Sequence, residues 1–338
     1  MFERGILRGL MLVVGLALLV AVLPTLVLAD DGNPPSGPDA SAVGHQTIAG
    51  NPLTIHVATD TSIQVLHAGH SDGQVHPPAY DEADSGGFGV FISSPGGLGN
   101  GPTVWGPDFA KHDDSSANIV LPWLSAGPQT TMGTGTAADP WWVQTDVLGP
   151  FGLNVTQWVG YVNGRDCFTV SYIVEARYFG LALPFSFFHA ANMHPDADEG
   201  GLGYHDAATG AVGALNGTKD FLEYLVPYTQ MGLPPADHYQ EAGYQAIWNN
   251  IGTGPFTPGP GFNDSIIATP YHDTGCGLQW DLQLPGVDPP GNFVEFALDW
   301  CFVEVEEPEF VPEPASVMLL ASGLMGLAGY AGLRLRKN

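Results

Sequence analysis

The sequence predicts an all-β protein built as a large antiparallel β-sandwich. The chain has 45 Gly and 29 Pro among its 338 residues, and these residues interrupt helices while they favour turns between short strands. Several segments alternate apolar and polar residues with a period of two, which is typical of half-buried strands. The predicted sandwich covers residues 47–303, a length that allows one large β domain or two smaller ones.

The first predicted strand pair lies at residues 54–68, with the sequence TIHVATDTSIQVLHA. Both halves combine β-branched and other apolar residues with polar ones in a strand-like order. Asp60 stands between the halves, and Asp forms tight turns through its side chain. The segment therefore predicts two strands joined near Asp60.

The strongest hairpin signal is WVGYVNGRDCFTVSYIVEARYF at residues 158–179. Asn163-Gly164 separates two β-rich runs and is a preferred sequence for a two-residue type I′ turn. The residues expected on the buried face after the turn are Phe168, Val170, Tyr172, Val174, Ala176 and Tyr178. The residues expected on the other face are Thr169, Ser171, Glu175 and Arg177. This alternation predicts a half-buried antiparallel strand.

The last part of the body contains one predicted helix and one predicted strand. Tyr239 to Ile251 has apolar residues at a helical spacing. Val294 to Phe302 instead alternates, because every second residue is a large apolar one. That period of two predicts a strand and excludes an amphipathic helix.

The first 29 residues have the three parts of an export signal. Two Arg residues precede an apolar run at residues 10–22, and small residues end at Ala29. We expect signal peptidase to cut after Ala29, because Pro24 disrupts a continuous helix and a small residue stands at the cleavage position. A retained N-terminal membrane helix is the alternative. Residues 30–46 have the composition of a disordered leader.

A second apolar segment lies at the C-terminus. Residues 315–333 are 19 residues without a charge, and a rise of 1.5 Å per residue gives about 28 Å of helix, just enough to span a bilayer core. Three basic residues follow at once: Arg334, Arg336 and Lys337. Because basic residues favour the cytoplasmic side, we expect a single transmembrane helix with its tip inside and the body outside.

The tripeptide Pro312-Glu313-Pro314 immediately precedes this helix, after an acidic linker at residues 304–311. Pro-Glu-Pro, one apolar span and a terminal basic cluster at residues 312–338 together resemble the PEP-CTERM sorting signal of exported bacterial proteins. The resemblance implies processing near the tripeptide by an exosortase-type protease, after transient residence in the inner membrane. Carriers of the signal tend to occur in bacteria that make extracellular polysaccharide. A permanent C-terminal anchor is the alternative.

The charge of the exported part excludes one class of partner. Outside the terminal segments the chain has 33 of its 35 acidic residues and only four basic residues, which gives a net charge of −29 with His neutral. The four basic residues are Lys111, Arg165, Arg177 and Lys219. Such a surface repels the phosphate backbone of nucleic acids. The acidity serves either solubility or the capture of divalent cations.

A Gly-rich loop at residues 194–206, HPDADEGGLGYHD, carries the candidate metal ligands Asp196, Asp198 and Glu199. Oxygen ligands crowded in such a loop suit calcium. The loop does not follow the EF-hand pattern, because Gly200 and Gly201 stand where a third ligand and the turn glycine are expected. A solvated acidic turn is the alternative, and no feature of the sequence requires a cofactor.

Eight Trp residues lie in the body, and most of them are expected to fill the core of a sandwich. Trp141 and Trp142, in the segment DPWWVQ, are the candidate platform on which a sugar ring would stack. Burial in the core is the alternative for this pair as well.

Cys167, Cys276 and Cys301 all lie in the exported part, where one disulfide can form and leave one thiol over. Three Cys residues do not determine the pairing. Nearness in sequence favours Cys276 with Cys301.

The body also resembles a known fold family. The stretches VTQWVGYVNGRDCFTVSYIVEARY, DEGGLGYHDAATGAVGALNG and DTGCGLQWDLQLPG are similar to secreted bacterial β proteins of the mutarotase-like supersandwich type. The resemblance implies a supersandwich and favours sugar-related functions. It identifies no catalytic residue.

Two functions fit these features. The first is a noncatalytic cell-surface or extracellular-matrix protein associated with the envelope or its exopolysaccharide. The alternative is a carbohydrate-active enzyme, with His and carboxylates as acid and base, or a lectin-like polysaccharide-binding module. No catalytic set is recognised. The G-x-S-x-G match at residues 69–73 precedes Pro77-Pro78, which would stop the helix that a nucleophile elbow needs.

Overall fold

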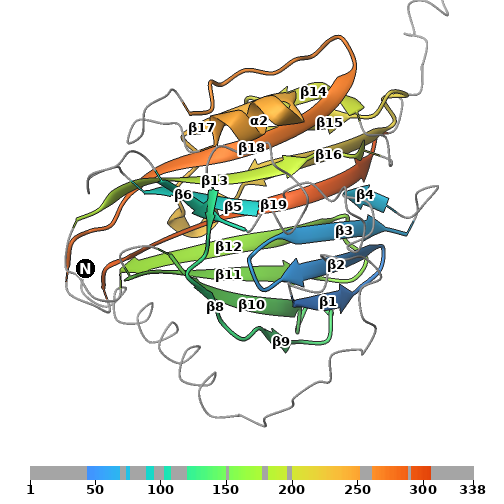
Figure 1. Cartoon of the computed structure of the whole chain (residues 1–338). Coiled ribbons are helices and arrows are strands. Elements are labelled where there is room, and N and C mark those ends of the chain that lie inside the picture. The colour runs from blue at the N-terminus through green and yellow to red at the C-terminus, as the bar shows by residue number, and fades with distance from the viewer. Residues whose placement is uncertain are drawn as a thin grey trace, which may run out of the picture. The chain divides into compact units, whose positions relative to one another are not determined.

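Strands make up most of the regular structure in the computed structural model (Figure 1). The structure describes residues 44–68, 74–76, 89–94, 103–107, 120–149, 152–176, 182–195, 200–251, 261–287 and 291–305. All of them belong to one compact unit, Gly37–Asn338. Neighbouring strands are antiparallel except β6 with β7, which are parallel. The all-β, antiparallel class that the sequence predicts is thereby confirmed.

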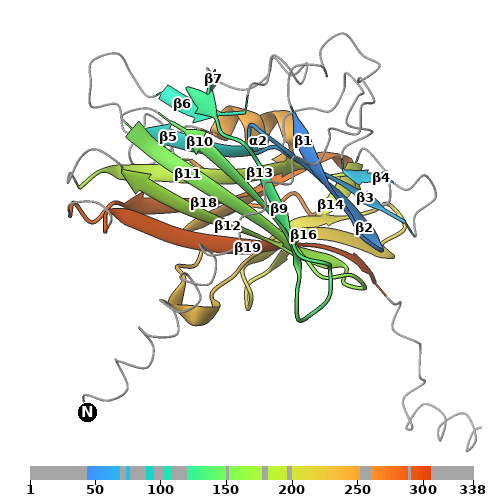
Figure 2. The same ribbon diagram turned by 90° about the horizontal axis from the view of Figure 1, so that it is seen from below.

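One layer of the sandwich, which we name the long layer, has the strand order β14-β15-β16-β19-β12-β11-β10, with β8 and β9 both paired to the outer edge of β10. Figure 2 shows β10, β11 and β12 side by side. The bounds of its strands are β8 Ser125–Ala126, β9 Thr130–Met132, β10 Trp141–Leu148, β11 Leu153–Tyr161, β12 Cys167–Ala176, β14 Gly200–Asp206, β15 Ala211–Leu215, β16 Phe221–Pro227 and β19 Phe293–Glu304.

The second layer, which we name the covering layer, has two parts. One is the separate four-stranded sheet β1-β2-β3-β4, and the other runs from β18 through β13 and β5 to β6 and β7, with β17 paired to β18. The bounds of its strands are β1 His45–Ala49, β2 Leu53–Ala58, β3 Ile63–His67, β4 Gln74–His76, β5 Gly89–Ser94, β6 Thr103–Gly106, β7 Val120–Pro122, β13 Pro184–Asn192, β17 His238–Gly243 and β18 His272–Gln283.

The two layers pack face to face through aromatic side chains. Ring centroids of Tyr172 on β12 and Phe187 on β13 are 4.8 Å apart, and those of Trp280 on β18 and Phe296 on β19 are 4.9 Å apart. The four-stranded sheet covers the same side, because Gln157 Nε2 on β11 donates hydrogen bonds both to the Thr61 carbonyl and to the Tyr172 hydroxyl. The long layer therefore has a buried inner face and a half-buried outer face.

Strand alternation follows the sequence prediction. In β12 the burial of side chains alternates along the whole strand, with Phe168 through Ala176 on the inner face. In β19 the inner residues Phe296, Leu298, Trp300 and Phe302 are at most 1% exposed. The strand pair at residues 54–68 is also confirmed as β2 and β3, and the Asp60 carboxylate accepts a hydrogen bond from the Ser62 amide at 3.1 Å in the turn.

The hairpin of β11 and β12 is confirmed, but its predicted type I′ turn is wrong. A type I′ turn needs positive φ at both central residues, whereas of Asn163 and Gly164 only Gly164 has it, at 82°. The Arg165 amide donates to the Val162 carbonyl at 3.2 Å, so glycine occupies the third position of a four-residue turn, as in type II. The connection between β11 and β12 therefore covers residues 162–166 and is longer than the predicted two-residue turn.

The helix predicted over Tyr239 to Ile251 is wrong in its first half. β17 runs to Gly243, and α2 covers only Tyr244–Asn250. Pairing of β17 with the long strand β18 satisfies the backbone from His238 to Gly243, and this tertiary pairing overrides a local helical spacing. A short 3₁₀ turn, η5, covers Gln230–Gly232.

Within the described residues no helix is long and apolar enough to cross a membrane. The span predicted at residues 315–333 and the export signal at residues 1–29 lie outside the described residues.

Candidate functional site

The outer face of the long layer is hollowed where β10, β11, β12 and β19 lie side by side. The hollow has a volume of about 610 Å³, and we name it the Trp142 hollow. The lining residues that matter below are Trp142, Gly160, Arg165, Cys167, Thr169 and Asp299. They come from segments up to 157 positions apart in the numbering, so only the fold brings them together.

Strand register places these residues in one row across the sheet. Trp142 is opposite Gly160, Gly160 is opposite Thr169, and Thr169 is opposite Asp299. Directly paired residues on neighbouring strands point to the same side of a sheet. The row therefore presents an indole, a hydroxyl and a carboxylate on the outer face.

The Trp142 indole lies directly over Gly160. A Cβ atom at Gly160 would be 2.3–2.7 Å from three atoms of the six-membered ring, so only glycine leaves room for the indole in this position. Trp158 supports it from the side, with ring centroids 6.4 Å apart and planes at 81°. Trp142 is partly exposed and lines the hollow. The result is an aromatic surface fixed by two neighbours.

Trp141 points to the opposite side of β10. It is paired with the buried Tyr161 and packs against the hydrophobic core. Successive side chains of a strand face opposite ways, so the two neighbouring Trp residues do not form one platform. Only Trp142 of this pair contributes to the hollow.

Asp299 supplies the negative charge of the hollow. The Thr169 hydroxyl donates a hydrogen bond to Asp299 Oδ1 at 2.5 Å, and among the described residues Oδ2 has no hydrogen-bond partner. Partial burial raises the pKa of the Asp299 carboxyl above its ordinary value, while the Thr169 hydrogen bond opposes this change. Oδ2 is thus a strong hydrogen-bond acceptor that faces the hollow.

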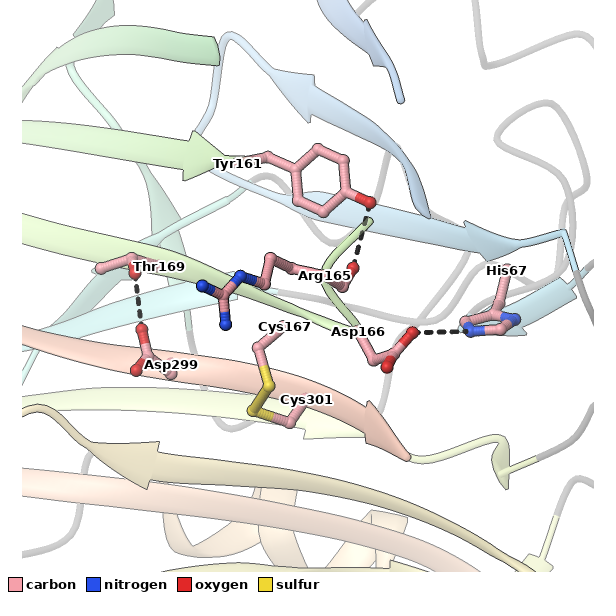
Figure 3. The surroundings of a disulfide bond; sticks show 8 residues. All are labelled: His67, Tyr161, Arg165, Asp166, Cys167, Thr169, Asp299 and Cys301. Atoms are coloured by element: carbon pink, nitrogen blue, oxygen red, sulfur yellow. Dashed lines mark hydrogen bonds and ion pairs between the residues drawn. A yellow bond between two sulfur atoms is a disulfide. The ribbon is translucent and has the colours of Figure 1, made fainter. Parts of the chain in front are cut away.

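Arg165 supplies a positive charge from the turn between β11 and β12. Hydrogen bonds fix this turn: the Gly164 amide donates to the Asn51 carbonyl at 2.6 Å, and the Tyr161 hydroxyl donates to the Arg165 carbonyl at 3.0 Å. The Arg165 side chain extends toward Thr169 and Asp299, as Figure 3 shows. Arg165 is exposed and lines the hollow, and among the described residues no hydrogen bond or ion pair engages its guanidinium.

Asp166 points the other way, toward the covering layer. Its Oδ1 atom lies 3.8 Å from Nε2 of the buried His67 on β3 (Figure 3). The Asp166 carbonyl also accepts a hydrogen bond from the Phe302 amide at 2.8 Å. Asp166 therefore ties the turn to both layers, and it lines the Trp142 hollow together with Asp299.

A disulfide closes one side of the hollow. Cys167 and Cys301 are directly opposite on β12 and β19, with Cα atoms 4.1 Å apart, and form the bond drawn in Figure 3. The predicted pairing of Cys276 with Cys301 is wrong, because β18 is not a neighbour of β19 in the sheet whereas β12 is. Cys276 is a buried free thiol, and burial raises its pKa well above the ordinary value.

The other residues singled out in the sequence do not belong to this site. Asp196, Asp198 and Glu199 lie outside the described residues, as do Ala29 and the tripeptide at residues 312–314. Among the residues that are described, no group of three or more His, Cys, Asp or Glu side chains is arranged to hold a metal ion. The calcium site and the processing sites stay predictions.

Sequence reasoning missed Asp299, Thr169, Arg165 and Gly160. Asp299 had one signal, because it is an acidic residue between the large apolar residues Leu298 and Trp300. Arg165 had another, as one of four basic residues in the exported part. Neither signal says that these residues meet Trp142, because that depends on the order of strands in the sheet.

Comparison with protein families identifies the C-terminus. Residues 310–337 match the PEP-CTERM protein-sorting motif, which confirms the resemblance seen in the sequence. The motif implies export, a membrane-anchored C-terminus before sorting, and processing by an exosortase-type system that delivers the protein outside the cell. A comparison with curated proteins finds no match.

Solved structures resemble the fold at low identity. A heparinase III has a TM-score of 0.41 and 10% identity over 84% of this chain and 37% of its own. A heparan sulfate lyase of Pedobacter heparinus has a TM-score of 0.35 and 9% identity over 78% and 37%. A protein of Salmonella typhimurium described as a mutarotase has a TM-score of 0.37 and 10% identity over 78% and 91%. The chain thus spans little more than a third of the first two proteins.

Proposed function

We propose that this exported protein binds extracellular polysaccharide through the Trp142 hollow and does not cleave it. The observation that carries the proposal is the row of Trp142, Thr169 and Asp299 on one exposed sheet face, with Arg165 beside it. A pyranose ring has an apolar face and a rim of hydroxyl groups. The hollow offers the matching pair of surfaces, a partly exposed indole and charged hydrogen-bonding groups.

Each group has a distinct role in this proposal. The Trp142 indole stacks on the sugar face. Gly160 leaves room for the indole in this position, because any larger residue would displace the ring. Asp299 Oδ2 accepts hydrogen bonds from sugar hydroxyls, and the Arg165 guanidinium donates hydrogen bonds to sugar oxygens. A small number of well-placed polar groups beside an aromatic surface is typical of ligand sites.

The alternative is a carbohydrate-active enzyme that uses Asp299 as an acid. Partial burial raises the pKa of this carboxyl, which is the direction that a general acid requires. Hydrolysis by the usual carboxylate pair needs a second carboxylate across the sugar. Asp166 is a second carboxylate that lines the hollow, but its Oδ1 lies 3.8 Å from Nε2 of His67, so it pairs with His67 and not with Asp299. The arrangement therefore favours binding.

A glycan array that includes immobilised polysaccharides, followed by an assay for new reducing ends, tests the proposed function. The full exported chain, solubilised in detergent, should be retained by a polysaccharide and should release no reducing ends. Release of reducing ends would support the enzyme instead. No retention on any glycan would show that the proposal is wrong.

The C-terminal segment supports the same function in a second way. We propose that an exosortase-type protease cuts near residues 312–314 and removes the span at residues 315–333. Prolines on both sides of Glu313 keep the tripeptide extended, in a form that suits a protease cleft. Removal of the span would free the sandwich to associate with polysaccharide at the cell surface or beyond it.

A further inference from the structure

A second hollow adjoins the first. Its volume is about 500 Å³, and it lies over β16, β17 and the loop that follows β16. The lining residues used below are Val226, Tyr228, Thr229, His238, Tyr239 and Asp299. We name it the Tyr228 hollow. Because Asp299 lines both hollows, they meet at this residue.

The two hollows continue one line across the strands. The row of Trp142, Gly160, Thr169 and Asp299 extends by register to Val226 on β16, which lines the Tyr228 hollow. Five adjacent strands give four steps of about 4.8 Å, so the line is about 19 Å long from Trp142 to Val226. That distance corresponds to several linked pyranose rings, whereas one sugar would fill only a part of it.

The second hollow offers the same kinds of contact as the first. Tyr228 is partly exposed there, and Thr229 is exposed. Tyr239, another lining residue, is held in place by His205, because their rings stack with centroids 3.9 Å apart and planes at 12°. Each hollow therefore offers an aromatic ring and a hydroxyl group.

The charged groups along this line are mostly acidic. The first hollow has Arg165 beside Asp299 and Asp166, and His238 in the second hollow lies 3.0 Å from Asp264 and 3.6 Å from Asp281. The whole exported part has a net charge of −29, so a polyanion would be repelled as it approaches. One Arg in the first hollow does not offset that repulsion along a polymer.

We infer that the Trp142 and Tyr228 hollows form one trench that holds an internal stretch of a linear, uncharged polysaccharide, with Asp299 at its centre. The inference rests on the proposed function, and it adds the kind of ligand. A site for a chain end or a single sugar needs one hollow. A trench lined on both sides of a central carboxylate accepts a chain that continues past each end.

Length dependence tests the trench. The probes are the disaccharides and hexasaccharides of three neutral glucans: cellobiose and cellohexaose, laminaribiose and laminarihexaose, maltose and maltohexaose. Calorimetry with the full exported chain should show that the hexasaccharide of at least one series binds about tenfold or more tightly than its disaccharide, because linked contacts add within one site. Equal affinity of both lengths in every series would overturn the trench and leave the proposed function intact.

Variants locate the extra affinity. Tyr228→Ala and Thr229→Ala should weaken the hexasaccharide toward the affinity of the disaccharide and leave disaccharide binding unchanged, whereas Trp142→Ala should weaken both lengths. Thr229 is exposed, so its variant keeps the test valid where Tyr228→Ala lowers the melting temperature. Unchanged hexasaccharide binding in both variants would overturn the trench. Stronger retention on immobilised polygalacturonate than on any neutral glucan would overturn the inference that the ligand is uncharged.

Discussion

Removal of the Cys167–Cys301 disulfide should destabilise the sandwich by a calculable amount. The bond joins residues 134 positions apart. For a loop of that length the chain-entropy model gives about 5 kcal/mol of stabilisation, close to the upper end of the range measured for native disulfides. At about 2–4 °C per kcal/mol for a domain of this size, the melting temperature should fall by ~10–20 °C.

The assay compares thermal unfolding with and without dithiothreitol in three proteins. Wild type should lose stability on reduction. The double variant Cys167→Ala, Cys301→Ala should start at the lower melting temperature and show no response to the reductant. Cys276→Ala is the matched control, because it removes the free buried thiol and should keep the full response.

Two results would refute this reasoning. Equal melting temperatures of wild type and double variant without reductant would show that loop closure contributes little. Loss of the reductant response in Cys276→Ala would show that Cys276 takes part in the bond.

Three further predictions concern separate parts of the molecule. Gly160→Ala should weaken polysaccharide binding about tenfold or more, because the new Cβ displaces the Trp142 ring. It should change stability by about 1 kcal/mol at most, because Ala is not disfavoured relative to Gly in a strand. Unchanged binding by calorimetry would contradict this prediction. Burial raises the pKa of Glu223 well above its ordinary value, so its contribution to stability is full below the unfolded pKa of about 4.3 and is lost as pH rises through the folded pKa. Wild type should therefore lose stability as pH rises above about 5, and Glu223→Gln should lose less in urea titrations; an equal or steeper loss would refute this sign. Alanines at residues 312–314 should leave export intact but trap a longer form of the protein in the detergent fraction. If mass spectrometry finds peptides of residues 315–334 at full stoichiometry in mature wild-type cells, the segment is a permanent anchor.

The strands could be predicted from the sequence because the alternation of apolar and polar residues follows the burial of successive residues in a strand. Phe168 to Ala176 alternates in the structure as it does in the sequence. In Phe296 to Phe302 the large apolar residues are buried as predicted, but Ala297 and Cys301 between them are buried too. The same patterns do not record which strands are neighbours. The disulfide shows this, because nearness in sequence favoured Cys276, while the sheet order places Cys167 beside Cys301.

The site was predictable only through one residue. Trp142 was predicted only together with Trp141 as a candidate platform, and the pair separates because successive residues of a strand face opposite ways. Asp299 and Thr169 are 130 residues apart, and no local pattern connects them. The helix predicted from Tyr239 failed for a related reason, because pairing with β18 decides the backbone there.

The most direct test of the central claim is the affinity of the retained polysaccharide for Trp142→Ala. Phe293→Ala is the matched control, because Phe293 is an exposed aromatic residue on β19, at 45%, and lines neither hollow. We expect Trp142→Ala to bind at least about tenfold more weakly, a change of ~1.4 kcal/mol, with its melting temperature unchanged, while Phe293→Ala binds as wild type does. Wild-type affinity in Trp142→Ala would contradict a polysaccharide site on the outer face of the long layer.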